Sequence, residues 1–252
     1  MHPLLLDLKE LTYMNKITAV FQNKKARIAH IIGGDPNINT TKAMVLALEG
    51  DADIIQISLP FSDPIVGALM EQADKRALAA GTTTDGLFQM CKELGEIVRR
   101  PLPLIFMAYA NSIFAYGSEK FMKNCAESGV DGLIVVDLPF AEKAEFATEC
   151  DRYNICLIST LSPTTPERIT AIAKDARGLI YCQPTPGTDD EKAVEAVIQK
   201  VKEVADIPCV VDNGVYAPSA SGVVVADLIQ MVADHGEKSP AIAAELLRNI
   251  WE

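Results

Sequence analysis

Side chains that can exchange protons or carry charge lie at or soon after several apolar runs of this chain. They comprise four aspartates, two tyrosines, a cysteine and a histidine: Asp137, Asp190, Asp212, Asp227, Tyr109, Tyr181, Cys182 and His30. Grouped carboxylates of this kind could bind a divalent cation through oxygen, or a cationic substrate. No spacing motif supports either ligand, and the three histidines lie far apart in the chain. We therefore expect no metal site and no cofactor.

The elements that would position these side chains are eight short apolar runs. The runs are rich in Ile, Val and Leu without strict alternation, which is typical of strands buried on both faces of a parallel sheet. They span residues 27–32, 53–58, 102–109, 132–137, 155–160, 178–183, 207–212 and 222–227. Amphipathic segments with helix start and stop signals separate most of them, as where Pro166 opens a segment that ends at Gly178.

Eight strands that alternate with helices predict an α/β fold of the TIM type, a (βα)8 barrel. We expect a single barrel domain over residues 1–252, with an N-terminal helix at 1–15. A doubly wound open sheet is the alternative, but no GxGxxG motif follows the first strand. Only VYAPSAS separates Gly214 from Gly222, which is too short for a helical crossover. The helix between strands seven and eight is therefore predicted to be lost or reduced.

Charge, apolar runs and cysteine spacing indicate which partners and which cell compartment to expect. The net charge of −11 disfavours nucleic acid and anionic membranes. The first residues are too acidic for a signal peptide, and no run approaches 18 apolar residues. The six cysteines contain no CxxC pair and lie mostly in apolar runs, as expected of buried free thiols in a reducing compartment. We expect a cytoplasmic protein.

Short motifs at the ends of the first four predicted strands resemble those of one known family. They are GGDP (33–36), LPFSDP (59–64), MAYANSIFAYG (107–117) and VVDLPFAE (135–142). In this order and spacing they resemble the tryptophan synthase α subunit, from about residue 14 to the C-terminus. The resemblance implies a barrel that cleaves indole-3-glycerol phosphate to indole and glyceraldehyde 3-phosphate, with help from two carboxylates acting as general acid and base.

Both of those carboxylates are missing. The family places a Glu on strand two, where this chain has Gln56, and an amide cannot exchange a proton at useful pH. The family's Asp follows in P-x-A-D-G-P, whereas this chain reads PIVGAL with Gly67 beside the missing position. The segment from Asp63 to the RAL motif is one residue shorter than the family pattern, which indicates a deletion. Tyr181 matches the family's tyrosine after strand six and is a candidate catalytic residue together with the positions of Gln56 and Gly67.

The phosphate-binding and indole-binding positions also differ from the family pattern. The resemblance places phosphate on glycine-rich loops after strands six, seven and eight. This chain has acidic residues at or beside all three places, so that the candidate binding positions are Gly187, Asp190, Asp212, Gly214 and Asp227. We expect Asp227 at the cap of the eighth helix, where its carboxylate would take the place of phosphate. Caps and turns are the alternative roles for these aspartates. His30 replaces an apolar residue of the indole pocket, or is a histidine satisfied by neighbouring backbone.

The loops that resemble the family's contact with the β subunit are retained. The candidate interface residues are Pro60, Phe61, Ser62, Asp63, Pro64 and Asn111. Tyr109 is a candidate binding residue beside Asn111, and Asp137 matches an aspartate that helps to order the loop after strand two. The alternative is that these residues only stabilise barrel loops, as Asp and Pro do in tight turns.

Three functions remain open from the sequence. The first is a non-catalytic homologue that binds and regulates a β-type subunit. The second is a barrel enzyme with different chemistry, which uses acidic residues at the barrel mouth on an unknown small molecule. The third is an active lyase with a displaced carboxylate such as Glu71.

Overall fold

The computed structural model describes residues 16–22, 24–65, 67–100, 102–185, 188 and 190–249. Its strands are all parallel and close into a barrel in chain order, with the last strand paired to the first. They are β1 (Ala26–Ile32), β2 (Ile54–Ser58), β3 (Leu104–Ala108), β4 (Gly132–Val135), β5 (Cys156–Leu161), β6 (Ile180–Cys182), β7 (Cys209–Asp212) and β8 (Gly222–Val225). This confirms the predicted TIM-type barrel. The predicted helix at 1–15 lies outside the described residues.

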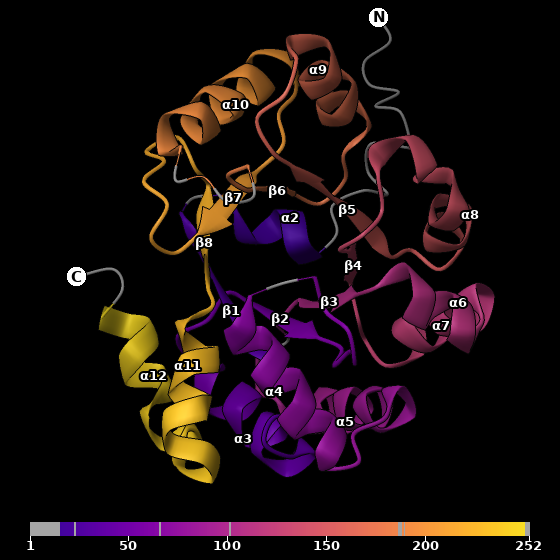
Figure 1. The fold of residues 1–252 in the computed structure, drawn as a ribbon, viewed down its shortest axis with the longest axis vertical. Helices are drawn as coiled ribbons and strands as arrows, with labels where there is room; N and C mark the ends of the chain where they lie inside the picture. Colours follow the sequence, from indigo (N-terminus) through magenta and orange to yellow (C-terminus); the bar gives the residue numbers. More distant parts are fainter. Residues whose placement is uncertain are drawn as a thin grey trace, which may run out of the picture.

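Helices surround the strands on most sides (Figure 1). They are α2 (Lys16–Val20), α3 (Ile38–Leu48), α4 (Ala68–Ala79), α5 (Thr84–Ile97), α6 (Ala110–Tyr116), α7 (Ser118–Glu127), α8 (Ala144–Arg152), α9 (Pro166–Asp175), α10 (Glu191–Val204), α11 (Asp227–His235) and α12 (Pro240–Asn249), with 3-10 turns η1 (Phe140–Glu142) and η2 (Gly236–Lys238). Side-chain caps fix several starts, because Asn37, Thr83 and Thr165 accept the backbone amides of Thr40, Gly86 and Arg168.

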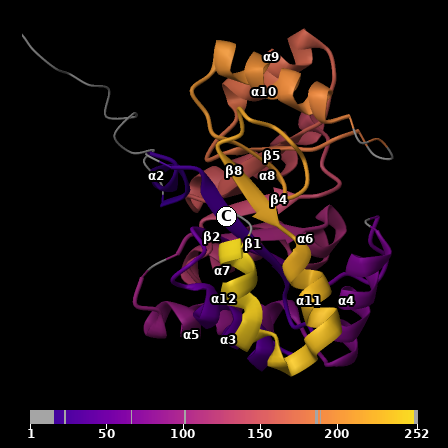
Figure 2. The same cartoon turned by 90° about the vertical axis from the view of Figure 1, so that its left-hand side faces the viewer.

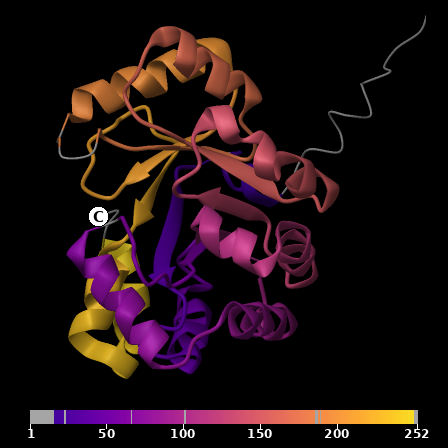
Figure 3. The same ribbon diagram turned by 45° about the vertical axis from the view of Figure 1, so that its right-hand side comes forward.

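The helical layer is interrupted between β7 and β8. Residues 213–221 join these two strands without a helix, as predicted from the short spacing. In Figures 1 and 2, α9 and α10 lie on one side of the β7–β8 connection and α11 and α12 on the other. Figure 3 shows the same two pairs of helices from another side, with β7 and β8 between them. The connection is held to α10 instead, because the carboxylate of Glu195 accepts the amide of Ser219 at 3.1 Å.

The interior of the barrel is apolar at its amino end. Ile28, Ile54 and Ile105 belong to one buried cluster, and Ile17 of α2 joins them from below the strands. A Cβ on Gly132 would lie only 2.8 Å from Cδ1 of Ile17, so a glycine is needed where this side chain enters. Because α2 closes the amino end, the space for a functional site lies at the carboxyl ends of the strands.

The turn after β1 is packed tightly against the segment that precedes α5. Gly34 has a φ of +84°, and an added Cβ would lie 2.0 Å from Oγ1 of Thr82. Only glycine meets both the conformation and the space at this position. The turn thereby fixes the next residue, Asp35, which is buried beside α4.

Candidate functional site

Polar side chains line the barrel interior above its apolar base. Alternate residues of a strand point to the same side of a sheet. Ile28 and Ile54 belong to the interior cluster, and so do Tyr181 and Val210. The residues two positions after Ile28, Ile54 and Val210 therefore point inward as well, and these are His30, Gln56 and Asp212. The structure thus brings the predicted residues His30, Gln56, Tyr181 and Asp212 into one interior.

His30 is a neutral, hydrogen-bonded side chain. Its Nε2 lies 2.8 Å from Oγ of Ser58 at the end of β2, and both residues are buried. Burial disfavours the charged ring and lowers the pKa of His30 to about 4. His30 therefore carries no charge at neutral pH, and its partner is a serine hydroxyl in place of the neighbouring backbone that we expected as the alternative.

We expect His30 to weaken the fold as the pH falls. The unfolded chain takes up a proton near pH 6.5 and the folded chain only near pH 4, so stability is lost between these values. Chemical denaturation of wild type and His30→Asn at pH 7.5 and pH 5 measures this. The free energy of unfolding of wild type should fall by about 2 kcal/mol more than that of the variant. Equal losses, or a His30 ring that titrates near pH 6.5 by NMR, would contradict the assignment.

Gln56 occupies the centre of β2 without any acid–base function of its own. It pairs with His30 in the register of β1 and β2, and its side chain is buried. The amide Nε2 donates to Sδ of Met107 at 3.5 Å, a weak acceptor on β3. Gly67 caps the start of α4 with ordinary backbone angles, and nothing lies within 4 Å of an added Cβ. Neither predicted catalytic position carries a carboxylate.

Tyr181 and Asp212 form a pair on neighbouring strands. The Tyr181 hydroxyl donates a hydrogen bond to the Asp212 carboxylate. Burial raises the pKa of Tyr181 well above its usual value, and the adjacent carboxylate raises it further. Burial also raises the pKa of Asp212, while the hydrogen bond from Tyr181 lowers it. The family-like tyrosine is therefore engaged with an acidic residue inside the barrel.

The other predicted binding residues do not converge on one ligand site. Asp190 caps α10 by accepting the amide of Ala193 at 3.0 Å, and Gly214 has a φ of +96° in the turn after β7. Gly187 lies outside the described residues. The expectation that Asp227 caps the eighth helix is wrong, because Ala226 is the cap of α11 and Asp227 is the first residue of that helix. Its carboxylate accepts the side-chain amide of Asn213 at 2.9 Å, so it faces the turn after β7.

The loops after β2 and β3 are locked together. The rings of Phe61 and Tyr109 stack with centroids 4.5 Å apart, and the Tyr109 hydroxyl accepts the amide of Ile65 at 3.0 Å. Asp137, after β4, accepts the amide of Ala110 at 2.8 Å and so holds the start of α6. Asp137 therefore contacts the loop after β3, whose Tyr109 in turn contacts the loop after β2.

The outer surface of these two loops is exposed. Ser62, Asp63 and Asn111 are open to solvent or nearly so, while Pro60 and Pro64 are half-buried. Ile65 has 74% of its surface exposed, which is a large apolar exposure at the tip of a loop. A single exposed apolar side chain is common on protein surfaces, so Ile65 shows that this loop is accessible but does not by itself define a contact surface.

One buried residue behind these loops was not singled out from the sequence. Asp74 of α4 has its Oδ1 buried without a hydrogen-bond partner, and no other buried side-chain nitrogen or oxygen of the described residues shares that condition. Burial and the nearby Asp35 raise the pKa of Asp74 to about 7, although a hydrogen bond from the backbone of Phe61 lowers it. The sequence around Asp74 did not indicate that this residue is buried, because its burial depends on how α4 packs.

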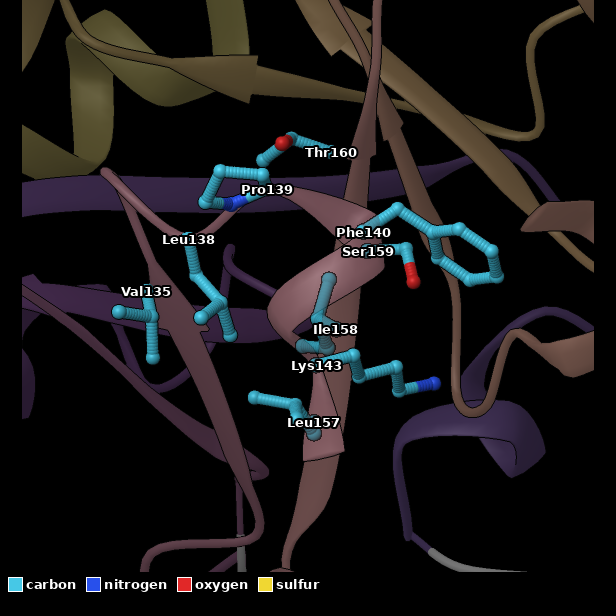
Figure 4. Close-up of a pocket in the computed structure, with 9 residues that line it drawn as sticks. All are labelled: Val135, Leu138, Pro139, Phe140, Lys143, Leu157, Ile158, Ser159 and Thr160. Carbon is cyan, nitrogen blue, oxygen red and sulfur yellow. The ribbon is translucent and has the colours of Figure 1, made fainter. Parts of the chain in front are cut away.

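A small cavity lies beside the barrel wall rather than in its mouth. It has a volume of about 30 Å³, room for very few water molecules, between β5 and the segment that leads from β4 to α8. Figure 4 shows its lining, which includes Leu138, Phe140, Lys143 and Thr160. Lys143 is already paired, since its Nζ lies 2.6 Å from Oδ2 of Asp175. This cavity is too small for a substrate.

Metal ligands do not gather in the part of the chain that the structure describes. No group of three or more His, Cys, Asp or Glu side chains is placed to hold a metal ion among these residues. All six cysteines are buried free thiols, as expected from the sequence. Within the same residues, no helix is both long enough and apolar enough to cross a membrane.

These features define a class: a parallel (βα)8 barrel whose polar residues line the interior at the carboxyl ends of the strands, where proteins of this fold place their active sites. A sequence model of the family described as tryptophan synthase alpha chain matches residues 17–244. The chain belongs to this family. It is 32% identical to the tryptophan synthase alpha chain of Lacticaseibacillus casei over 94% of both chains. It is 36% identical to that of Alkaliphilus metalliredigens, over 80% of this chain and 78% of the relative.

Solved structures agree with the family. A point mutant of the tryptophan synthase α subunit from Pyrococcus furiosus superposes with a TM-score of 0.82 at 28% identity, covering 90% of this chain and 98% of that one. A tryptophan synthase complex from the same organism gives a TM-score of 0.81 at 27% identity with the same coverage. The predicted family and fold are therefore confirmed.

Proposed function

We propose that this chain is a non-catalytic α-type subunit that binds and regulates a β-type subunit. The observation that carries the proposal is Gln56, a buried amide at the position where the family resemblance implies the glutamate. It lies behind loops that keep the family's motifs. Without a carboxylate there or at Gly67, the interior lacks both of the groups that the resemblance implies as acid and base for cleavage of indole-3-glycerol phosphate.

The acidic interior supports the same conclusion. Asp212 lies inside the barrel, and Asp227 and Asn213 occupy the turn where the resemblance implies phosphate. Two like charges about 4 Å apart near a protein surface repel by roughly 4 kcal/mol. A phosphate dianion is therefore an unfavourable ligand in this barrel.

The loops after β2 and β3 supply the contact surface. One P. furiosus structure is described as showing mutual activation of the tryptophan synthase a2b2 complex, so α and β subunits assemble in that protein. In this chain the Phe61–Tyr109 ring stack and the Tyr109–Ile65 hydrogen bond join the two loops, and Asp137 holds the start of α6 beside them. With the loop closed, these contacts reduce the entropy that a partner would lose in ordering the surface, which supports the proposed binding role.

We expect the chain to change the rate of a β-type subunit when the two are mixed. The assay follows tryptophan formation from indole and serine by the β subunit, with this chain titrated in. Saturable activation or inhibition supports the proposal. Ile65→Asp should weaken the effect at least about tenfold, because it places a charge in the apolar contact. The matched control is Tyr216→Asp, another exposed apolar residue, on the β7–β8 connection, which should have no effect. No binding and no rate change would contradict the regulatory role.

A second candidate is an enzyme of different chemistry centred on Tyr181 and Asp212. It is favoured by one observation, namely that a carboxylate with a raised pKa is hydrogen-bonded to a tyrosine inside the barrel. The third alternative, a displaced lyase carboxylate at Glu71, has less support. Glu71 is only half-buried, and it forms an ion pair with Lys75 one turn along α4.

A further inference from the structure

Asp74 lies directly behind the loop after β2. Its residue is 3% exposed, and Oδ1 has no hydrogen-bond partner. The neighbours on its helix, Ala73 and Ala77, are fully buried against Ile32 of β1 and Ile229 of α11. The carboxyl group is therefore enclosed by packed elements on one side and meets the loop through the backbone of Phe61 on the other.

No positive charge compensates Asp74 among the ion pairs of the described residues. The carboxylate of Asp35, in the turn after β1, raises the pKa of Asp74 by charge repulsion. Arg76 is committed to Asp35, because its Nε and Nη2 donate to the two Asp35 oxygens at 2.8 Å each. An ionised Asp74 would therefore be a buried charge beside a second carboxylate, with one oxygen unsatisfied.

We propose that Asp74 is a pH-dependent latch for the loop of residues 59–65: the loop is closed while the carboxyl group is protonated and is released when it ionises. Release of the loop should weaken binding of the β-type partner above neutral pH, and this consequence rests on the proposed function. The amide of Phe61 favours the carboxylate, but the cost of burial is the larger effect. Opening the loop admits water to Oδ1 and removes that cost.

The midpoint follows from the surroundings. Under the closed loop the pKa of Asp74 is raised to about 7, so both protonation states of its carboxyl group are populated near neutral pH. On the loop side, burial raises the pKa of Tyr109, the hydrogen bond from the Ile65 amide lowers it, and the charges of Asp74, Asp137 and Asp63 raise it, so this phenol stays neutral. On α4 itself, Glu71 is paired with Lys75.

The charged residues of α11 lie elsewhere. Asp227, Asp234 and His235 line a separate groove between α11 and α12. His30, in the barrel interior, is neutral at and above pH 5.5 because burial lowers its pKa to about 4. His235 lies in that separate groove, so its replacement serves as a control.

The test uses the chain alone, so that it does not depend on any partner. Amide signals of Phe61 and Ile65 are followed by ¹H–¹⁵N NMR from pH 5.5 to 8.5, together with their hydrogen-exchange protection. Wild type should show a transition near pH 7, with protection falling at least about tenfold from pH 6 to pH 8. Asp74→Asn should keep the loop protected throughout. Glu71→Gln, on the same helix as Asp74, and His235→Asn, in the separate groove, should leave the midpoint where it is.

Two outcomes would overturn the latch: amide signals that do not titrate in wild type, or a transition that persists in Asp74→Asn. Partner binding is measured separately, and wild-type affinity should fall by up to about tenfold per pH unit above the midpoint. If the loop titrates and no β-type subunit binds, the proposed function fails while the latch stands. If a β-type subunit binds and the loop does not titrate, the latch fails alone.

Discussion

Purified protein should release indole from indole-3-glycerol phosphate at least about 10⁴-fold more slowly than an active α subunit. Each positioned acid or base contributes roughly 10²–10⁴-fold, and this chain lacks both. The comparison is with the P. furiosus α subunit, assayed under the same conditions with and without a β subunit. Turnover within about tenfold of that control would contradict the non-catalytic proposal. It would also require an acid and a base other than Gln56 and Gly67.

Restoring one carboxylate should not restore the reaction. Gln56→Glu would place a carboxylate against Met107 and the neutral His30, in a site that offers no cation. Burial would hold that group protonated and destabilise the fold above its pKa. Adding Gly67→Asp is sterically permitted, since the space at Gly67 is open. The double variant should still be inactive, because the acidic turn at Asn213 and Asp227 disfavours phosphate. Measurable turnover would show that the chain had lost only the two catalytic carboxylates and had kept a usable phosphate site.

The barrel was predictable from the sequence because its determinants are local. Each strand is a short apolar run, and several helix starts carry their own cap or proline, so the order of elements follows from the sequence directly. The absence of a helix between β7 and β8 followed from the short segment that joins these two strands. These signals need no knowledge of which residues meet, and parallel pairing in chain order then closes the barrel.

The site was predictable only in part, because hydrogen-bond partners depend on register. Gln56 was identified by its position in a motif, but its contact with Met107 comes from the pairing of β2 with β3. Asp227 was expected at a helix cap and instead bonds Asn213, since the cap of that helix is the residue before it. Asp74 was missed because an aspartate on an amphipathic helix normally faces solvent. Only the packing of α4 against β1 and α11 shows that it does not.

Replacement of Asp74 by Asn should stabilise the protein, and more so as the pH rises. The pKa of Asp74 is raised from 3.8 to about 7, so the folded state holds a proton that the unfolded chain has already released. Stability of the wild type is therefore lost as pH rises from about 4 to 7, and the loss is complete above the folded pKa. A shift of about three pKa units corresponds to about 4 kcal/mol. Denaturation of wild type and Asp74→Asn at pH 4, 6 and 8 measures the growing difference.

The size of that difference also measures the latch. If the loop of residues 59–65 stayed closed over an ionised Asp74, the difference at pH 8 would reach the full value of about 4 kcal/mol. If the loop opens, water reaches the carboxylate, and the difference levels off at the free energy that opening costs. A plateau below the full value, together with loss of Phe61 protection at the same pH, would give the closing energy of the loop. A difference that does not change with pH would mean that Asp74 is hydrated in the folded state, and both the stability effect and the latch would then fail.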